Sequence, residues 1–542
     1  MKRIIALGYI IAIVGCSSSL QGQAHIPYLV KQGAATQLRV ADKPFLMLGG
    51  ELGNSTASAL PELDTVFAKL QQMNLNTVLT PAYWELIEPE EGKFDFTSID
   101  AAIHAARTHN LKIVFLWFGS WKNSMSCYAP AWVKENYKKY PRAVTESGKP
   151  LEIMSAFHRN NLEADKHAFV QFMKHLAATD NEQQTVIMVQ VENEIGMLDS
   201  AREYTPEANK WFNAEAPGQL MDYLLKNKKS LRPQLLRQWG ANGFKTQGNW
   251  TSIFGEGLET EEIFMAWHYG LYVQEIAQSG KQVYPLPMYL NAALNSRGRK
   301  AGQYPSAGPL AHLLDIWRVA APAIDFLSPD IYDPGFEDWL AQYHVNGNPL
   351  FIPEIQLQEA NAIRALYAFG AHDAMGFSPF SIEDVADPEK YPLTHSYRML
   401  QQLSPLLTEI QGKGKTNGIL LNGETKEKVI SRGNYTFTFT HYSSLPWEKN
   451  KDTASWSETG AILIQLSEKE FIVAGSGVVV TFDNIWKDGT VTGISSIDEI
   501  EWKDGKMIPL RRLNGDQDHQ GRHLRIPVGE WNIQQVKLYD YK

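Results

Sequence analysis

Hydrophobic residues between positions 45 and 377 form short continuous runs, separated by segments whose apolar residues have helical spacing. Continuous apolar runs rich in β-branched residues are typical of strands that a parallel sheet buries on both faces. These runs predict eight strands, at residues 45–50, 76–81, 112–118, 186–191, 287–291, 324–329, 349–353 and 373–377. Eight strands that alternate with helices predict an α/β fold, a closed (β/α)8 TIM barrel.

Helical spacing predicts the helices between these strands, at residues 63–73, 99–109, 166–176, 261–279, 310–320 and 394–403. One stretch interrupts the alternation. Residues 200–259 are irregular and contain several Gly, Asn and Trp residues, so we interpret them as an insertion with one helix at 219–226.

The pattern changes after about residue 410. Five β-rich runs follow, separated by Gly, Asn and Asp turns, at residues 418–421, 435–442, 461–466, 477–482 and 534–538. They predict a smaller antiparallel β-domain, a sandwich or a partly open barrel. The expected domains are a lipoprotein signal peptide at 1–16, a tether at 17–36, a catalytic barrel at 37–410 and a β-sandwich-like domain at 411–542.

The N-terminus has the pattern of an export signal. Lys2 and Arg3 precede an apolar run at residues 4–14, which is shorter than the about 20 residues that span a bilayer. The run leads into Ile-Val-Gly-Cys, which resembles a bacterial lipobox and predicts that Cys16 carries lipid. The alternative is an ordinary signal cleaved elsewhere. We expect a lipid-anchored protein in the periplasm or outer membrane of a Gram-negative bacterium, with Cys127 buried as a small apolar residue.

Composition narrows the class of protein. The 542 residues exceed what one core usually holds, and 44% hydrophobic and 20% charged residues are ordinary for a globular protein. The net charge is −9 and no basic cluster occurs, which argues against nucleic acid as a partner. No His-Glu-x-x-His, Cys/His cluster or phosphate-binding Gly motif occurs, so we predict no metal and no cofactor.

Two carboxylates end buried strands. The run at 186–191 is followed by Glu192, Asn193 and Glu194, and the run at 349–353 by Glu354. Catalytic groups of α/β barrels lie at the C-terminal ends of strands. A pair of carboxylates that face one pocket suits glycoside cleavage, one as acid/base and the other as nucleophile. The alternative, that each glutamate only forms a structural ion pair, is weaker for two such strand ends than for one.

Further side chains at strand ends are candidates for sugar contacts: Tyr83, Trp84, Trp121, Asn291 and Tyr332. Aromatic side chains at these positions can stack on a sugar. The alternative for Trp121 is a place in the core, and for Tyr332 a place in an exposed loop. The Tyr332 phenol is placed to hydrogen-bond to the Glu354 carboxylate and hold it ionised for attack.

These motifs together resemble glycoside hydrolase family 35, the β-galactosidases. The residues that carry the resemblance are Gln190-x-Glu192-Asn193-Glu194, Asn76–Thr80 with Trp84, Glu88–Phe96 and Pro353-Glu354. The resemblance implies a (β/α)8 retaining glycosidase in which Glu194 is the acid/base and Glu354 the nucleophile. It also implies that Asn193 binds the sugar 2-hydroxyl and that Glu192 contacts the galactose ring.

The sequence departs from that family at three places. Trp84-Glu85-Leu86-Ile87-Glu88-Pro89 replaces the usual Trp-Asn-x-His-Glu-Pro. Gln183-Gln184-Thr185 replaces the usual Gly-Gly-Pro, and Gly119-Ser120-Trp121 lacks the usual Ala-Glu. The pattern is closest to a bacterial branch with a small C-terminal β-domain, some of whose members act on galactosylated xyloglucan.

We therefore predict a retaining exo-β-galactosidase that removes terminal β-galactosyl residues from plant cell-wall type oligosaccharides such as xyloglucan side chains. One alternative is another retaining barrel enzyme, a β-glycosidase, endo-glucanase or mannanase. Another is a lipoprotein that binds glycans without cleaving them. A homodimer is one option for the assembly, which the sequence does not decide.

Overall fold

The structure is a computed structural model, which describes residues 26–345, 347–486, 488–503 and 505–542. The predicted signal peptide, including Cys16, lies outside the described residues. No helix in the described part of the chain is long and apolar enough to span a membrane. Cys127, expected to be buried, is exposed.

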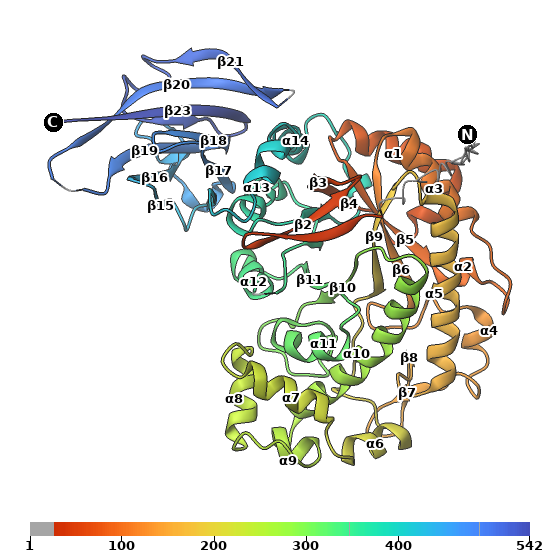
Figure 1. The fold of residues 1–542 in the computed structure, drawn as a ribbon. Coiled ribbons are helices and arrows are strands. Elements are labelled where there is room, and N and C mark those ends of the chain that lie inside the picture. Colours follow the sequence, from red (N-terminus) through yellow and green to blue (C-terminus); the bar gives the residue numbers. More distant parts are fainter. Residues whose placement is uncertain (1–25, 346, 487, 504) are drawn as a thin grey trace, which may run out of the picture.

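Eight parallel strands close into a barrel, which confirms the predicted fold (Figure 1). Each strand pairs with the next along the chain, and the last pairs with the first. The strands are β4 (Met47–Glu51), β5 (Thr77–Tyr83), β6 (Lys112–Lys122), β9 (Val186–Asn193), β10 (Met288–Ala293), β11 (Phe326–Ile331), β12 (Ile352–Ile355) and β13 (Gly376–Pro379). Apolar side chains fill the interior, and the rings of Tyr289 and Phe326 stack there with centroids 5.4 Å apart. The barrel interior is therefore a packed core rather than a pore. Functional side chains can be exposed only at the ends of its strands.

A small sheet precedes the barrel and covers its N-terminal end. It consists of β1 (Tyr28–Gln32), β2 (Ala35–Val40) and β3 (Lys43–Phe45), and β3 leads directly into β4. Leu38 and Val40 of β2 belong to the same apolar cluster as Met47 and Leu79 of the barrel. Residues 28–36, assigned to the tether from the sequence, are therefore folded and part of this lid, because their alternate side chains have an apolar surface to cover.

The helices around the barrel are α1 (Leu63–Gln72), α2 (Trp84–Ile87), α3 (Thr97–Thr108), α4 (Ala131–Lys134), α5 (Arg159–Asp180), α10 (Leu258–Val283), α11 (Leu314–Ala320), α12 (Phe336–Tyr343), α13 (Asn361–His372) and α14 (Pro392–Ile410). A hairpin of β7 (Arg142–Val144) and β8 (Pro150–Met154) precedes α5. The insertion holds four helices rather than the one predicted: α6 (Pro206–Asn213), α7 (Gly218–Asn227), α8 (Pro233–Ala241) and α9 (Trp250–Phe254). Their short length hides the helical period, although the caps Thr205 and Asn249 mark two of their starts.

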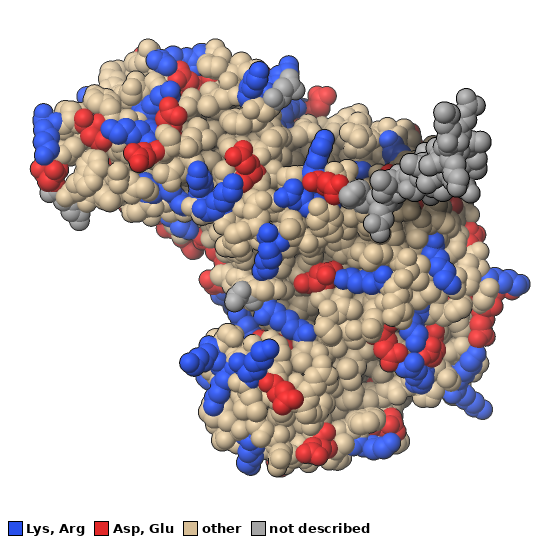
Figure 2. Space-filling view, in the orientation of Figure 1, with Lys and Arg blue, Asp and Glu red and all other residues tan. Residues whose placement is uncertain are grey.

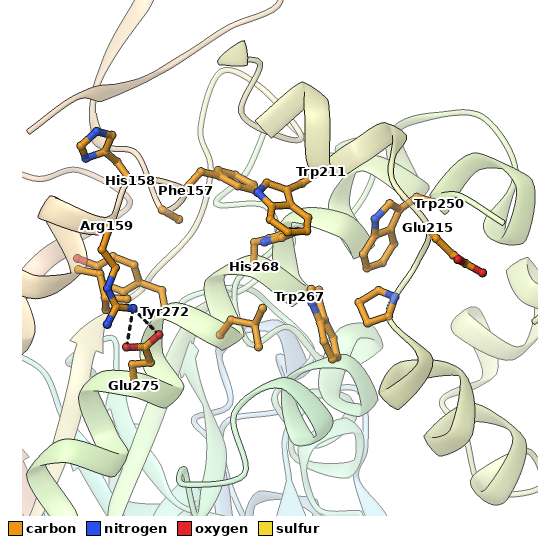
Figure 3. A pocket seen from close by; sticks show the side chains of 14 residues that line it. Phe157, His158, Arg159, Trp211, Glu215, Trp250, Trp267, His268, Tyr272 and Glu275 are labelled. Carbon is orange, nitrogen blue, oxygen red and sulfur yellow. Dashed lines mark hydrogen bonds and ion pairs between the residues drawn. The ribbon is translucent and has the colours of Figure 1, made fainter. Parts of the chain in front are cut away.

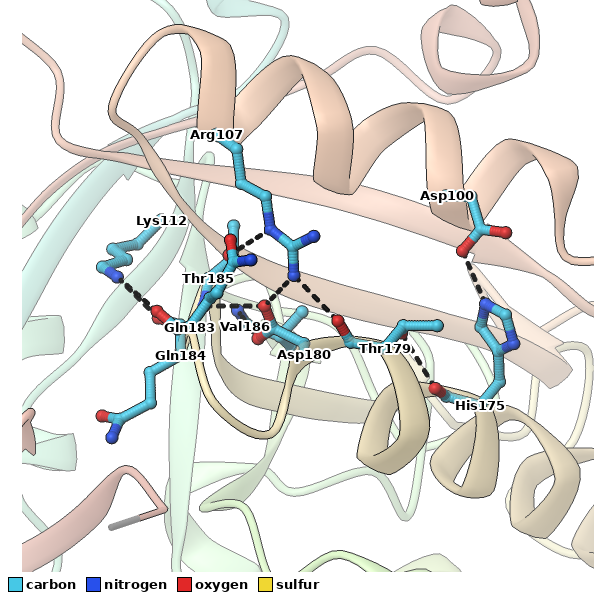
Figure 4. Close-up of polar contacts among 10 residues, drawn as sticks. All are labelled: Asp100, Arg107, Lys112, His175, Thr179, Asp180, Gln183, Gln184, Thr185 and Val186. Atoms are coloured by element: carbon cyan, nitrogen blue, oxygen red, sulfur yellow. Dashed lines mark hydrogen bonds and ion pairs between the residues drawn. The ribbon is translucent and has the colours of Figure 1, made fainter. Parts of the chain in front are cut away.

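The turn from α5 into β9 is held by a buried carboxylate (Figure 4). Asp180 accepts hydrogen bonds from the backbone N–H of Thr185 at 3.0 Å and of Val186 at 2.6 Å, and pairs with Arg107 at 2.8 Å. Gln184 has a left-handed backbone with φ of 48°, a conformation that suits glycine. Gln184 stands where the family 35 motif Gly-Gly-Pro has its second glycine, and it adopts the left-handed backbone that suits a glycine.

The C-terminal domain is a sandwich of two antiparallel sheets, as predicted. The larger sheet has the order β14 (Thr416–Leu421), β17 (Thr459–Gln465), β18 (Glu470–Ser476), β23 (Asn532–Tyr541), β20 (Val491–Lys503) and β21 (Lys506–Leu513). The smaller has the order β15 (Glu427–Arg432), β16 (Tyr435–His441), β19 (Val478–Asn484) and β22 (Leu524–Ile526). Tyr435, Phe437 and Phe439 of β16 are buried between the sheets, because alternate residues of a strand face the same side.

The sandwich packs on the barrel helix α13. Gly370 and Gly418 meet there, and a Cβ on Gly418 would lie 2.5 Å from the Tyr367 carbonyl oxygen. Arg364 of α13 also forms an ion pair with Glu458, at 2.6 Å. Only glycine permits so close an approach of two backbones.

The face of the molecule in Figure 2 shows acidic and basic side chains interspersed over both domains.

Candidate active site

The two glutamates singled out from the sequence lie together at the C-terminal end of the barrel. Glu194 directly follows β9, and Glu354 is on β12. Both are buried, with 5% and 4% of their surface exposed. One carboxyl oxygen of each, together with one from Asp330, lie within 4.8 Å of one another. At this separation, the Glu194 and Glu354 carboxyl groups can both contact the same atom of a bound molecule.

Asp330 of β11 is a third carboxyl group in this cluster. It is the direct neighbour of Glu354 in the register of β11 and β12. Burial raises its pKa well above the usual value, and the charges of Glu354 and Glu194 raise it further. The raised pKa favours the protonated form of Asp330, and a side-chain hydrogen bond joins Asp330 to the adjacent Glu194. The Asn291 side-chain amide donates to Asp330 Oδ2 at 2.6 Å and fixes its position.

Glu51 and Lys122 complete the charged groups of the site. Glu51 ends β4 with 1% of its surface exposed. Burial raises the pKa of Glu51 well above the usual value, the charge of Glu354 raises it further, and that of Lys122 lowers it. Lys122, on β6 and 4% exposed, also lowers the pKa of Glu194. Lys122 is thus a cation that favours the ionised form of Glu51 and Glu194, against the effect of burial and of the charge of Glu354.

Glu194 has the environment of an acid that works near neutral pH. Burial, and then the charge of Glu354, raise its pKa to about 7, against the opposing effects of Lys122, Asp330 and Asn123. Asn123 donates a hydrogen bond to Glu194 Oε2. A carboxyl group with a pKa near 7 can both donate and accept a proton under ordinary conditions.

Glu354 is held by a phenol, as the sequence predicts. The Tyr332 hydroxyl donates to Glu354 Oε1 at 2.5 Å. Burial and the charge of Glu354 raise the pKa of Tyr332, so the phenol stays protonated and remains a donor. Glu354 Oε2 accepts no hydrogen bond from an N–H or hydroxyl group among the described residues. The phenol thus fixes Oε1, and the Glu51 carboxyl group contacts the Glu354 carboxylate as well.

The backbone at the end of β9 is strained. Glu192 and Glu194 have left-handed φ angles of 59° and 46°. Three hydrogen bonds hold the turn: Glu194 N to Asn291 Oδ1 at 2.9 Å, Ser124 N to Glu194 O at 3.2 Å, and Gln190 Nε2 to Glu192 O at 3.0 Å. Left-handed backbone costs on the order of 1 kcal/mol or more for a residue with a Cβ and is concentrated at functional sites.

Asn193 lies between these two residues and is 1% exposed. Neither its side-chain oxygen nor its nitrogen has a hydrogen-bond partner in the described part of the chain. A buried amide without hydrogen-bond partners is costly. We therefore infer that a bound ligand supplies the partners of the Asn193 side chain.

Glu192, expected to contact galactose, lies elsewhere. It is fully buried and its Oε2 accepts from the Trp121 backbone N–H at 2.8 Å. Burial, and then the charge of Asp165 on α5, raise its pKa well above the usual value. The left-handed turn breaks the strand alternation, so Glu192 faces Asp165 of the helix layer and supports the end of β6 instead of joining Glu194 and Glu354.

The aromatic candidates are also packed into the protein. Trp84 is fully buried and donates from Nε1 to Glu88 Oε2 at 3.0 Å. Trp121 is fully buried with its ring edge-on to Tyr272 at 4.8 Å, so it faces α10 and is not a sugar platform. Tyr83 is 3% exposed and stacks on Tyr128 at 5.6 Å. Asn291 and Tyr332 do reach the carboxylates, but as groups that position them.

The sequence reasoning missed Glu51, Lys122, Asn123 and Asp330. The signal was present, since Glu51 and Asp330 end apolar strands in the same way as Glu354.

The oxygens of Glu194, Asp330 and Glu354 are also close enough to bind one cation. Because Asn123, Asn291 and Tyr332 already hydrogen-bond to these carboxyl groups, the donor set suits proton transfer better than metal binding.

Comparison with known protein families gives two matches. Residues 61–253 match glycoside hydrolase family 42, described as Beta-galactosidase. This segment includes Glu194, and the match supports the predicted glycoside hydrolase. Residues 393–525 match a domain of unknown function, DUF5597. No curated protein matches.

The resemblance to family 35 is not supported by these matches, which point to family 42 instead.

Three solved structures among those similar to the chain are β-galactosidases. That of the psychrophilic Marinomonas ef1 has a TM-score of 0.45 and 13% identity, and the match covers 67% of this chain and 60% of that one. That of Rahnella sp. R3 has a TM-score of 0.45 and 15% identity, with 68% and 57% covered. That of the Antarctic haloarchaeon Halorubrum lacusprofundi has a TM-score of 0.44 and 15% identity, with 66% and 58% covered. The chain thus matches less than two thirds of the length of each.

Proposed function

We propose that the protein is an exo-acting retaining β-galactosidase. The observation that carries this proposal is the arrangement of Glu194 and Glu354, whose oxygens lie within 4.8 Å of each other. Retaining glycosidases place their carboxyl groups about 5–5.5 Å apart, whereas inverting enzymes need about 6.5–9.5 Å to admit a water molecule. The family 42 match supports the galactoside as substrate.

In the first step, Glu354 Oε2 attacks the anomeric carbon while Tyr332 holds Oε1. A bond forms between this carbon and Oε2, and the bond to the leaving oxygen breaks as Glu194 gives that oxygen its proton. In the second step, Glu194 removes a proton from water. The water oxygen bonds to the anomeric carbon and Glu354 leaves as a carboxylate. A pKa of about 7 lets Glu194 serve in both directions.

Asn193 and Glu51 are the groups that we assign to the sugar hydroxyls. The Asn193 amide has no partner among the described residues, and Glu51 Oε1 likewise accepts no hydrogen bond there. A hydroxyl group both donates and accepts, so it can satisfy either group. A site that leaves buried polar atoms unpaired without the correct hydroxyl discriminates strongly against a sugar that lacks it.

The substrate that we propose is a terminal β-galactosyl residue on a plant cell-wall type oligosaccharide, such as a xyloglucan side chain. Another retaining activity on a different β-glycoside has the same two carboxylates and is the alternative to test. Initial rates on a panel of nitrophenyl glycosides decide between them. The proposal requires β-galactoside cleavage to exceed cleavage of the β-glucoside and β-mannoside, and a reversed order would refute it.

Two variants test the roles of the carboxylates. Glu354→Ala should abolish turnover of every galactoside, because no covalent intermediate forms. Glu194→Ala should still release dinitrophenol in a burst, since this leaving group needs no proton, and then stall. Azide should restore turnover of Glu194→Ala with a β-galactosyl azide product. Absence of both burst and β-azide would contradict the assignment.

We further propose that the enzyme is exported and tethered by lipid on Cys16. The support is the Ile-Val-Gly-Cys sequence after a short apolar run. Cys16→Ser should move the protein from the membrane fraction to the soluble fraction, and a variant that still sediments with membranes would show that another segment is the anchor.

A further inference from the structure

A second cavity lies outside the barrel, among α5, α10 and the insertion helices (Figure 3). Its volume is about 470 Å³, within the range of about 300–1,000 Å³ of small-molecule sites. None of the carboxyl groups of the candidate active site lines it. The lining residues include Phe157, Trp211, Trp250, Trp267, His268 and Tyr272.

Aromatic rings form a large part of the wall. Trp211 on α6 is 47% exposed, which is unusual for so large an apolar side chain. Phe157, Phe264 and Trp211 surround the His268 ring, with centroid distances of 4.5, 4.6 and 6.2 Å. Figure 3 shows the Trp211 and His268 rings in the centre of this wall.

Polar atoms are placed among these rings without partners. No group in the described part of the chain hydrogen-bonds to the ring of His268 or to the indole N–H of Trp211, Trp250 or Trp267. Burial lowers the pKa of His268 to about 3, so the ring is neutral and offers one donor and one acceptor. His158, also on the wall, has a buried Nδ1 without a partner. Of these atoms, His158 Nδ1 is the buried one without a partner among the described residues, and a buried polar atom normally has a partner, so it points to a ligand. The His268 nitrogens and the indole N–H groups are open to the cavity.

Charged groups occur only in part of the lining. Arg159 forms an ion pair with Glu275 at 2.7 Å, drawn in Figure 3, and Glu215 is on the opposite side. The pair is exposed, so both groups can also interact with a hydroxyl at the mouth. A charged ligand would have to enter among neutral rings and lose its hydration, which is unfavourable.

We propose that this cavity is an accessory site for one pyranose ring of a neutral glycan. A pyranose has an apolar C–H face that can stack on Trp211 and hydroxyl groups that can pair with the His268 nitrogens and the indole N–H groups. The wall supplies both kinds of surface, whereas a purely apolar ligand would leave the nitrogens unpaired. The site would hold a polysaccharide at a point remote from the bond that is cleaved.

Titration calorimetry with cellotetraose tests this proposal. The Glu354→Gln variant of the full chain prevents turnover, and cellotetraose has no galactose for the proposed active site. Addition of Trp211→Ala should weaken binding between about twofold and tenfold, the range of a single aromatic stacking contact. Trp447→Ala is the matched control, because Trp447 is also 47% exposed but lies in the C-terminal sandwich. This control should leave the affinity unchanged.

A second variant separates stacking from hydrogen bonding. His268→Phe keeps the ring and removes both nitrogens, so it should also weaken cellotetraose binding. Neither pocket variant should change kcat/KM for a nitrophenyl galactoside in the otherwise wild-type enzyme. Binding that is absent, or equal in Trp211→Ala and in the Trp447→Ala control, would overturn the proposal. A Pro-rich peptide that binds in place of cellotetraose would do the same. The titration needs no galactosidase activity, so it stands even if the proposed function fails.

Discussion

The pKa of Glu194 should depend on the charge of Glu354, and the structure gives the size of the effect. Two unit charges at 4.8 Å, the upper limit of the oxygen separation, repel each other by about 3.5 kcal/mol at an effective dielectric constant of about 20. This energy corresponds to about 2.5 pKa units. Lys122 partly offsets it, because its charge acts on Glu194 in the opposite direction. We expect a net effect of about one to two units.

The perturbation is Glu354→Gln, which removes the charge and keeps the shape. A negative neighbour disfavours the ionised form of a carboxyl group, so its removal lowers the pKa of Glu194 from about 7 towards 5 or 6. The measurement is a ¹³C NMR titration of protein labelled at the glutamate carboxyl carbons, with Glu194→Gln used to assign the signal.

Glu88→Gln is the matched control for this titration. Glu88 is also buried, with 2% exposed, but its partners are Trp84 and Gly92. The Glu194 pKa should not change in this variant. A shift of less than about half a unit in Glu354→Gln would show that burial alone sets the Glu194 pKa, and would refute the electrostatic reasoning. In the wild type, kcat/KM should fall above about pH 7, because the acid is then ionised.

Three further variants test individual contacts. Glu192→Gln should change the free energy of unfolding, measured in urea, by less than about 1 kcal/mol because burial favours the neutral form of the Glu192 carboxyl group, whereas Glu192→Ala should cost about 2–4 kcal/mol; equal losses would contradict this. Tyr332→Phe should lower kcat on aryl galactosides about 10- to 100-fold through loss of a hydrogen bond to the charged Glu354, and unchanged kcat would exclude that role. Arg107→Ala should cost about 2 kcal/mol in urea unfolding because Asp180 stays buried, and no loss would show that the backbone N–H groups suffice.

The sequence by itself determined the barrel and its two principal carboxylates. Strands of a parallel sheet are buried on both faces, so they must be continuous apolar runs, and a carboxylate at the end of such a run is conspicuous. Glu194 and Glu354 are therefore visible without a structure. The same rule would have given Glu51 and Asp330, had it been applied to every strand.

Only the tertiary structure decided the direction of each side chain at the strand ends. Strict alternation would place Glu192 and Glu194 on one side of β9. The left-handed backbone at both residues breaks that alternation and sends Glu192 towards Asp165 while Glu194 meets Glu354. An irregular register between Trp117 and Lys122 accompanies the outward turn of Trp121 and the place of Lys122 among the carboxyl groups. Such turns are held by contacts between residues far apart in the chain, so no local pattern in the sequence reports them.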